Sequence, residues 1–271
     1  MSRKTLALAW FIVPAVLAGT GVVATGVPVA SAATSTVDYV ALGDSYSSGV
    51  GAPDASGPCG RSPSGYPARW AAQHPTASLR FVACGGATTD DVRRDQLAAL
   101  DGGTDLVSIT IGGNDAGFFP TVMLCASRTD AACEQQVTTA RSTISQVLPG
   151  KLDATYQAIR GRAPNATVVV LGYPRLFEPN ADCPTGGMST FKRRVLNSGA
   201  DHLARVIADR ARAAGFTFAD VRSAFTGHGI CSPAAWINNV STTRLADSFH
   251  PNVAGYEQGY LPAFSVAAGV S

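Results

Sequence analysis

The chain has 271 residues, of which 46% are hydrophobic and 15% are charged, with 21 lysines and arginines against 19 aspartates and glutamates. This composition is typical of a globular protein with a sizeable core, and it excludes a largely disordered chain. A nearly neutral chain without basic runs also argues against nucleic acid as the main partner.

The first 33 residues have the features of an export signal. Arg3 and Lys4 form a short positive region, a long apolar stretch follows, and Ala30-Ser31-Ala32 is a small-residue cleavage signal. An uncleaved anchor is the alternative, because the apolar stretch is long enough to span a bilayer. Glycines and prolines interrupt it, so we predict a signal peptide over 1–33, a single secreted domain over 34–271 and no membrane anchor after cleavage.

Five short apolar runs predict the strands of a parallel sheet. Runs of valine, isoleucine and leucine without polar alternation are typical of parallel strands that are covered on both faces. In chain order, the predicted strands are Tyr39–Leu42, Leu79–Cys84, Leu106–Ile111, Thr167–Gly172 and Phe216–Val221.

Apolar residues at helical spacing predict helices between and after these strands. The predicted helices are Asp91–Leu100, residues 131–162 with a break at Pro149-Gly150, Thr190–Ala214 ended by Gly215, and Pro251–Tyr260 started by its proline. The alternation of strands and helices predicts one three-layer α/β domain. The segment Gly49–Pro67, rich in glycine and proline, is expected to be a long loop beside the active site.

Six cysteines follow the predicted signal peptide. An even number in an exported chain predicts three disulfides, although six cysteines allow 15 pairings. The simplest pairing is sequential, and each bond would then stabilise the fold by roughly 2.5–4 kcal/mol on the chain-entropy model. The predicted bonds are Cys59–Cys84, Cys125–Cys133 and Cys183–Cys231.

Gly43-Asp44-Ser45 ends the first predicted strand and places a serine at its carboxyl end. In an open α/β sheet, ligands bind at this edge. A serine there can have a free N–H and an exposed hydroxyl, as a nucleophile needs. A simple helix cap is the alternative role for Ser45.

Asp247 and His250 lie three residues apart in a predicted turn before the last helix. A serine nucleophile needs a base, and that base works best when a carboxylate fixes its tautomer. One short turn can supply both groups, although a surface or capping histidine is the alternative. The other three histidines have no comparable aspartate partner within a short turn, and of these His228, in a glycine-rich loop, stays open as a candidate.

Two further segments end the second and third predicted strands at the same edge. Cys84-Gly85-Gly86 offers backbone N–H groups that can approach a ligand closely. Gly112-Gly113-Asn114 presents an amide side chain. Backbone N–H groups and an asparagine amide can together form an oxyanion hole. Tight turns are the alternative interpretation of both segments.

In this order, the segments resemble the blocks of the GDSL family of hydrolases, also called the SGNH superfamily. The matching blocks are Gly43-Asp44-Ser45, Gly86, Gly112-Gly113-Asn114-Asp115 and Asp247-Ser248-Phe249-His250. The resemblance covers nearly the whole chain after the signal peptide, and it is greatest to secreted actinobacterial lipases and esterases. It implies a flavodoxin-like α/β/α sandwich around a five-stranded parallel sheet.

The resemblance also implies a role for each residue. Ser45 would be the nucleophile, His250 the base that takes its proton and returns it to the leaving alcohol, and Asp247 the residue that orients His250. The N–H groups of Ser45 and Gly86 and the side-chain amide of Asn114 would hold the oxyanion. This chemistry needs no metal ion and no organic cofactor.

The sequence therefore predicts a secreted, monomeric serine hydrolase that cleaves acyl esters, in particular of lipids, through an acyl-enzyme. The alternatives are an acetyl esterase for carbohydrates, a phospholipase of the A or B type, an acyltransferase and a non-catalytic binding module. The apolar segment from Phe118 to Met123, just after Asn114, would line an acyl groove or belong to the core.

Overall fold

The computed structural model describes residues 9–10, 36–183 and 188–269 of the chain. The predicted signal peptide lies almost wholly outside the described residues and stays a prediction. The part from Ser35 to Ser271 forms one compact unit. No helix among the described residues is long and apolar enough to cross a membrane.

Five parallel strands form one sheet in the order β2-β1-β3-β4-β5, which confirms the predicted parallel sheet and its flavodoxin-like arrangement. The chain passes from β1 to β2 on one side and then crosses to β3 on the other, so the strand order reverses between β1 and β3. The carboxyl ends of these two strands are where ligands bind in such sheets. The strands are β1 (Asp38–Gly43), β2 (Ser78–Phe81), β3 (Leu106–Thr110), β4 (Thr167–Leu171) and β5 (Thr217–Ala219).

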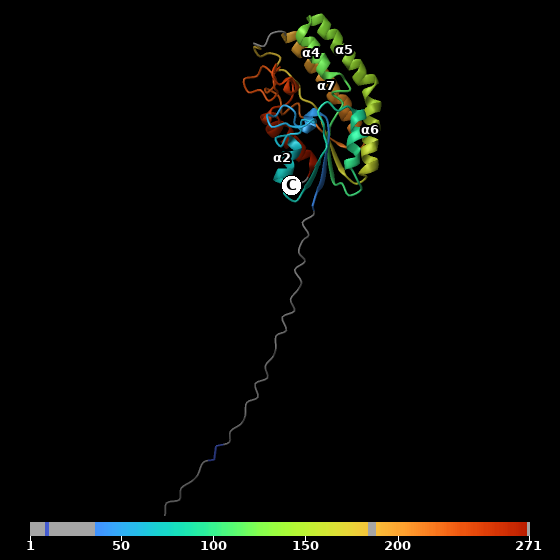
Figure 1. Ribbon diagram of the computed structural model, residues 1–271, viewed down its shortest axis with the longest axis vertical. Helices are drawn as coiled ribbons and strands as arrows, with labels where there is room; N and C mark the ends of the chain where they lie inside the picture. Colours follow the sequence, from blue (N-terminus) through green and yellow to red (C-terminus); the bar gives the residue numbers. More distant parts are fainter. Residues whose placement is uncertain (1–8, 11–35, 184–187, 270–271) are drawn as a thin grey trace, which may run out of the picture. The chain divides into compact units, whose positions relative to one another are not determined.

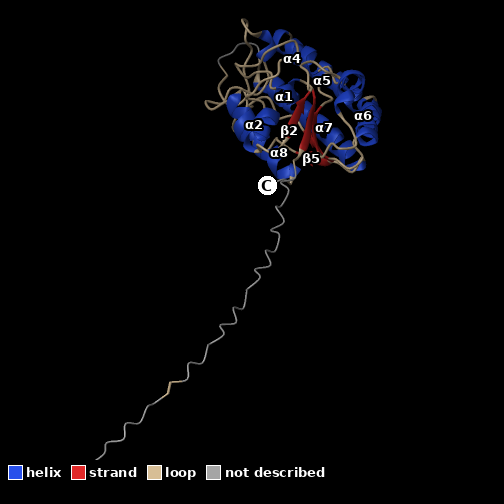
Figure 2. Ribbon diagram, turned by 60° about the horizontal axis from the view of Figure 1, so that its bottom comes forward, coloured by secondary structure: helices blue, strands red, loops and turns tan. Residues whose placement is uncertain are grey.

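Helices cover both faces of the sheet. Figure 2 shows α5, α6 and α7 on one side of the strands and α2 and α8 on the other, and Figure 1 shows α4 beside α5. The three-layer prediction is thus confirmed. The α-helices are α1 (Ser45–Ser48), α2 (Tyr66–Gln73), α3 (Thr89–Asp91), α4 (Phe118–Ser127), α5 (Asp130–Gln146), α6 (Leu148–Arg162), α7 (Thr190–Ala213) and α8 (Leu261–Ala268).

The central strands match the prediction closely, whereas the edge strands are shorter than predicted. Residues 39–42 of β1 are fully buried, as continuous apolar runs require. β2 ends at Phe81 instead of Cys84, because the N–H groups of Val82 and Ala83 both donate to the carbonyl of Ala41. This shared acceptor interrupts the ladder and turns the chain toward the glycine segment that follows.

Two predicted helices differ from the observed ones at their ends. The break between α5 and α6 falls at Val147, because Pro149 fits the first turn of α6, where its missing N–H costs nothing. The last helix does not begin at Pro251, which forms an isolated bridge with Ile237. The Asn252 side chain instead caps a helical turn that starts at Val253, accepting from the N–H of Gly255, and this turn continues through a π-helical segment (Gly255–Tyr260) into α8.

The predicted helix Asp91–Leu100 is helical but only partly α. After α3, a π-turn over Val92–Gln96 and a 3₁₀ turn over Leu97–Ala99 complete it. The π-turn brings the buried side chain of Gln96 to Gly43, where it accepts from the N–H at 2.7 Å and donates to the carbonyl at 2.9 Å. An irregular helix thus braces the end of β1.

Two helices near the site were not predicted, namely α2 and α4. α2 begins at Tyr66 and shortens the predicted long loop by two residues. The three disulfides join the predicted partners Cys59–Cys84, Cys125–Cys133 and Cys183–Cys231, which confirms the sequential pairing.

Candidate active site

Ser45 stands at the turn from β1 into the short helix α1. Gly43 has a φ of 118°, and a Cβ there would lie 2.4 Å from the carbonyl oxygen of Thr110, so only glycine lets the turn pass this close to β3. The Asp44 side chain caps α1 by accepting from the N–H of Tyr46 at 3.0 Å. Ser45 is therefore held at the carboxyl edge of the sheet.

His250 reaches Ser45 from the other end of the sequence. Its Nε2 lies 2.7 Å from the Ser45 Oγ, although 205 residues separate them. Backbone hydrogen bonds with Asn238 hold the segment on both sides of Phe249, whose φ of 66° turns the imidazole back toward the sheet. The structure thus brings the predicted nucleophile and base into direct contact.

The imidazole of His250 is neutral near pH 7. Burial lowers its pKa from 6.5 to about 4, and the hydrogen bonds to backbone carbonyls of Ser248 and Ala246 oppose that change only in part. A neutral Nε2 next to a serine hydroxyl can accept its proton, so the pair is a competent nucleophile and base.

The structure corrects the expected contact between Asp247 and His250. The His250 Nδ1 lies 3.0 Å from the backbone carbonyl oxygen of Ser248, which can only accept a hydrogen bond. The Asp247 carboxylate instead pairs with the guanidinium of Arg244 at 2.6 Å. Arg244 precedes the 3₁₀ turn Leu245–Asp247, and its three-residue spacing places it on the same side as Asp247. The carbonyl of Ser248 therefore orients the imidazole.

Residues with three available hydrogen-bond donors line the same cleft as the Ser45 hydroxyl. The cleft has a volume of about 430 Å³, and Ser45, Gly86, Asn114 and His250 all line it. Among the described residues, neither the N–H of Ser45 nor that of Gly86 has a hydrogen-bond acceptor. Asn114 donates one amide hydrogen to the carbonyl of Ala87 at 2.9 Å, which leaves the other amide hydrogen for a ligand.

The two neighbouring glycines have different environments. The N–H of Gly85 donates to the carbonyl of Cys59 at 2.9 Å and so is already engaged. Gly86 has a φ of 81°, with no atom within 4 Å of where a Cβ would lie. Its N–H has no hydrogen-bond acceptor among the described residues, which supports Gly86 rather than Gly85 as a donor.

The apolar segment after Asn114 contributes both to the cleft and to the core. Phe118 and Phe119, at the start of α4, line the cleft. Val122, one turn later, is only 1% exposed and belongs to the core. A second, apolar cavity lies between α4, α5 and α7 and shares Tyr46, Phe118 and Tyr173 with the cleft.

Tyr173 is a residue of the site that the sequence did not reveal. Its hydroxyl accepts from the N–H of Gly113 at 2.9 Å and donates to the buried carboxyl of Asp44. Burial raises the pKa of Asp44 to about 7, although the hydrogen bond from Tyr173 opposes this rise. The only available signal was position, because Tyr173 follows the fourth strand at the edge that holds the other site residues.

His228 is not part of the site. Its imidazole stacks on Trp236 and its Nδ1 lies 2.8 Å from the carbonyl of Ala234. Among the described residues, no group of three His, Cys, Asp or Glu side chains could hold a metal ion. The arrangement at Ser45 is suited to acyl transfer, because it combines a nucleophile, a base and donors for a developing oxyanion.

Comparison with known proteins agrees with this chemistry. The sequence model of the GDSL-like Lipase/Acylhydrolase family matches residues 41–258. Lipase 1 of Streptomyces coelicolor is 47% identical over 266 residues, covering 96% of this chain and 98% of its own. A lipase of Streptomyces rimosus is 49% identical over 233 residues, covering 85% of this chain and 86% of its own.

Two solved structures are similar in both sequence and fold. The extracellular lipase from Streptomyces rimosus has a TM-score of 0.83 at 48% identity, covering 85% of this chain and 99% of its own. Phospholipase A1 from Streptomyces albidoflavus has a TM-score of 0.83 at 45% identity, covering 86% and 100%.

Proposed function

Because the chain belongs to the GDSL-like lipase/acylhydrolase family and is a carboxylic ester hydrolase, we propose that it releases fatty acyl groups from lipid esters outside the cell. Ser45 is the nucleophile and His250 the base. The observation that carries these roles is the 2.7 Å contact between the Ser45 Oγ and the His250 Nε2 in a cleft with unpaired N–H donors.

The reaction proceeds in two halves. The Ser45 Oγ attacks the ester carbonyl carbon while the His250 Nε2 takes the hydroxyl proton. The N–H groups of Ser45 and Gly86 and the amide of Asn114 stabilise the oxyanion, and His250 then protonates the leaving alcohol. Water attacks the acyl-enzyme with the same assistance and releases the carboxylic acid.

The carbonyl of Ser248 supports both halves. It accepts a hydrogen bond from the Nδ1–H, so the neutral imidazole keeps its free lone pair on Nε2, which faces Ser45. When His250 becomes positively charged, the same carbonyl dipole stabilises that charge.

The walls of the cleft favour an acyl chain longer than acetate. Phe118 and Phe119 form an apolar wall beside Asn114, and the neighbouring cavity under α4 continues the apolar surface. One relative in the comparison is a phospholipase A1, which makes phospholipids the second substrate class to test.

We further propose that the protein is secreted and acts as a monomer. The export-signal features of residues 1–33 support secretion. A related lipase is described as extracellular. One chain supplies the nucleophile, the base and all three proposed donors, which supports activity without a second copy.

The proposal is tested by hydrolysis of a p-nitrophenyl ester series from acetate to palmitate. The wild-type enzyme is expected to prefer medium or long acyl chains. The Ser45→Ala variant is expected to lose activity on every ester of the series while keeping its melting temperature. Ser142→Ala, an exposed serine on α5, is the matched control and should behave as wild type. A Ser45→Ala variant with half the wild-type rate would refute the assignment, and a preference for acetate would refute the lipid substrate.

A further inference from the structure

The three proposed oxyanion donors lie on three different loops. The N–H of Ser45 follows β1, that of Gly86 follows β2, and the amide of Asn114 follows β3. An oxyanion hole works only when its donors are held at the position where the negative charge develops. The contacts between these loops therefore determine how well the site stabilises the transition state.

The loop after β2 is joined to the loop after β3 at two residues that follow Gly86, namely Ala87 and Thr89. The Asn114 amide donates to the carbonyl of Ala87, next to Gly86. The neighbouring Asp115 accepts from the N–H of Thr89 at 2.9 Å and from its hydroxyl at 2.7 Å. Asp115 is thus the partner through which the far end of the Gly86 loop is held against the Asn114 loop.

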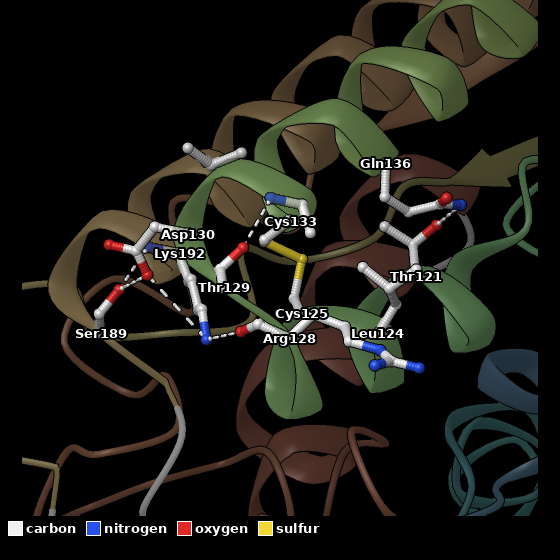
Figure 3. Close-up of a disulfide and its surroundings, with 12 residues drawn as sticks. Thr121, Leu124, Cys125, Arg128, Thr129, Asp130, Cys133, Gln136, Ser189 and Lys192 are labelled. Carbon is white, nitrogen blue, oxygen red and sulfur yellow. Dashed lines mark hydrogen bonds and ion pairs between the residues drawn. A yellow bond between two sulfur atoms is a disulfide. The ribbon is translucent and has the colours of Figure 1, made fainter.

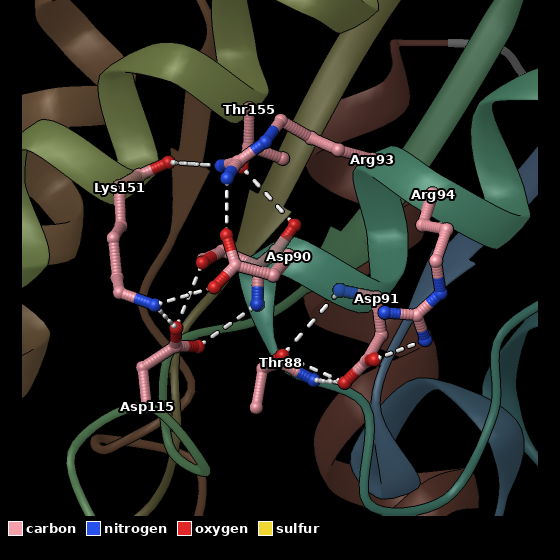
Figure 4. Close-up of polar contacts among 9 residues, drawn as sticks. Thr88, Asp90, Asp91, Arg93, Arg94, Asp115, Lys151 and Thr155 are labelled. Carbon is pink, nitrogen blue, oxygen red and sulfur yellow. Dashed lines mark hydrogen bonds and ion pairs between the residues drawn. The ribbon is translucent and has the colours of Figure 1, made fainter.

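Asp115 carries a charged side chain that is almost completely buried. Its side chain is 2% exposed, and its nearest cation is Lys151, with an N–O distance of 3.4 Å. Figure 4 shows its carboxylate facing the start of α3 and the Lys151 ammonium. Burial of a charged group is costly unless hydrogen bonds and a partner satisfy it. A carboxylate can accept from both Thr89 donors and from an ammonium at once.

We propose that Asp115 is a positioning residue, which fixes the Asn114 amide relative to the Gly86 N–H by holding Thr89. Asp115 does not line the cleft, so it acts on the substrate only through its neighbours. This inference rests on the proposed function, in which Asn114 and Gly86 are oxyanion donors.

The test compares Asp115→Ala with wild type in kcat, KM and affinity for an alkyl trifluoromethyl ketone. That ketone forms an adduct with a serine nucleophile and places an oxyanion in the hole. We expect kcat and ketone affinity to fall together by about tenfold, part of the 10²–10³ lost with a whole donor. KM should change less than about threefold, because the oxyanion forms only in the transition state.

Asp115→Asn is the conservative variant that should restore most of kcat. Its amide oxygen can accept from the Thr89 N–H, and its NH₂ group can donate to the Thr89 hydroxyl. Asp90→Ala is the matched control, because the half-exposed Asp90 carboxylate pairs with the same Lys151 at 2.7 Å but makes no hydrogen bond to Thr89 or Asn114 in the described part of the chain. It should leave kcat unchanged.

In an Asn114→Ala background, Asp115→Ala should cost less than about threefold, because the donor that it positions is already gone. Thr89→Val replaces Asp115→Ala if that variant does not fold, since it removes one of the two contacts and keeps the side-chain shape.

A folded variant with wild-type kcat, or a full tenfold loss in the Asn114→Ala background, would overturn the inference. Activity that still depends on Ser45 in those variants would leave the proposed function intact.

Discussion

At the scale of single residues, the hydrogen bond from His250 to a backbone carbonyl changes what is expected of Asp247. In serine hydrolases with an Asp–His contact, replacing the aspartate by asparagine costs about 10⁴, because the wrong imidazole tautomer results. Here the Ser248 carbonyl can only accept, so it selects the active tautomer by itself.

Asp247→Asn should therefore lower kcat/KM by less than about threefold, while His250→Ala should lose as much as Ser45→Ala. The lost ion pair with Arg244 is partly exposed and contributes little. The check is steady-state kinetics on one p-nitrophenyl ester, with the melting temperature as control. A loss above about 10³ with an intact fold would mean that the carboxylate does orient His250 in solution.

If His250 is the base, as proposed, its lowered pKa should set the acid side of the pH profile. The base is active when neutral, so kcat/KM rises with pH through the pKa of His250 in the free enzyme. Because burial lowers that pKa from 6.5 to about 4, activity should persist well below pH 6.5.

A pH–rate profile from pH 3.5 to 9 measures this inflection. Asp44 is buried nearby, and its pKa, raised to about 7, also lies within this pH range. The pH–rate profile of Asp44→Asn therefore distinguishes an inflection caused by His250 from one caused by Asp44. An inflection at or above pH 6.5 that persists in Asp44→Asn would contradict a buried, neutral His250.

At the scale of secondary-structure elements, α4 borders the cleft in which we propose that the substrate binds. Its first residues, Phe118 and Phe119, line the cleft, and the Cys125–Cys133 disulfide ties its far end to α5. Figure 3 shows this bond with the Lys192 ammonium donating to the carbonyl of Arg128 between the two helices. The end of α4 is thus fixed to α5 and α7, while its start borders the site.

Replacing Cys125 and Cys133 together by serine should therefore affect both stability and substrate preference. On the chain-entropy model, the eight-residue separation predicts a loss of about 2.5 kcal/mol in the free energy of unfolding. We also expect KM to rise for long-chain esters but not for acetate, because on the proposed function only a long acyl chain would extend to Phe118 and Phe119.

Denaturant unfolding and the ester series measure the two effects. The matched control replaces Cys183 and Cys231, which lie outside the catalytic cleft. It should lower stability without changing the chain-length preference, and an equal change in both variants would argue against a specific role for α4.

At the scale of the whole molecule, three disulfides close loops with sequence separations of 25, 8 and 48 residues. Their combined contribution is about 10 kcal/mol on the chain-entropy model. The total stability of a typical domain is about 5–15 kcal/mol. The oxidised fold should therefore depend on these bonds.

Complete reduction should add six hydrogens to the mass, since no free cysteine is found among the described residues. The reduced and alkylated protein should be largely unfolded at 37 °C and inactive. Intact-mass analysis and circular dichroism before and after reduction are the measurements. A reduced protein that melts within a few degrees of the oxidised one would show that the apolar core suffices.

Much of the architecture was predictable from the sequence by itself. Buried parallel strands have continuous apolar runs, so the five strands and the three-layer arrangement followed from local patterns. The glycine-containing turns at strand ends indicated Ser45, Gly86 and Asn114, because the carboxyl ends of parallel strands meet at one edge. An even cysteine count after a predicted export signal indicated three disulfides, and the sequential pairing was the simplest of the 15 that six cysteines allow.

Only the tertiary structure decided the partners of individual polar groups. Whether His250 contacts Asp247 or the Ser248 carbonyl depends on the positive φ of Phe249 and on the turn that pairs Asp247 with Arg244. Likewise, the contacts of Tyr173 and Asp115 join segments that are far apart in the sequence. A hydrogen bond depends on tenths of an ångström and on direction, whereas a residue pattern specifies only which face or edge a side chain occupies.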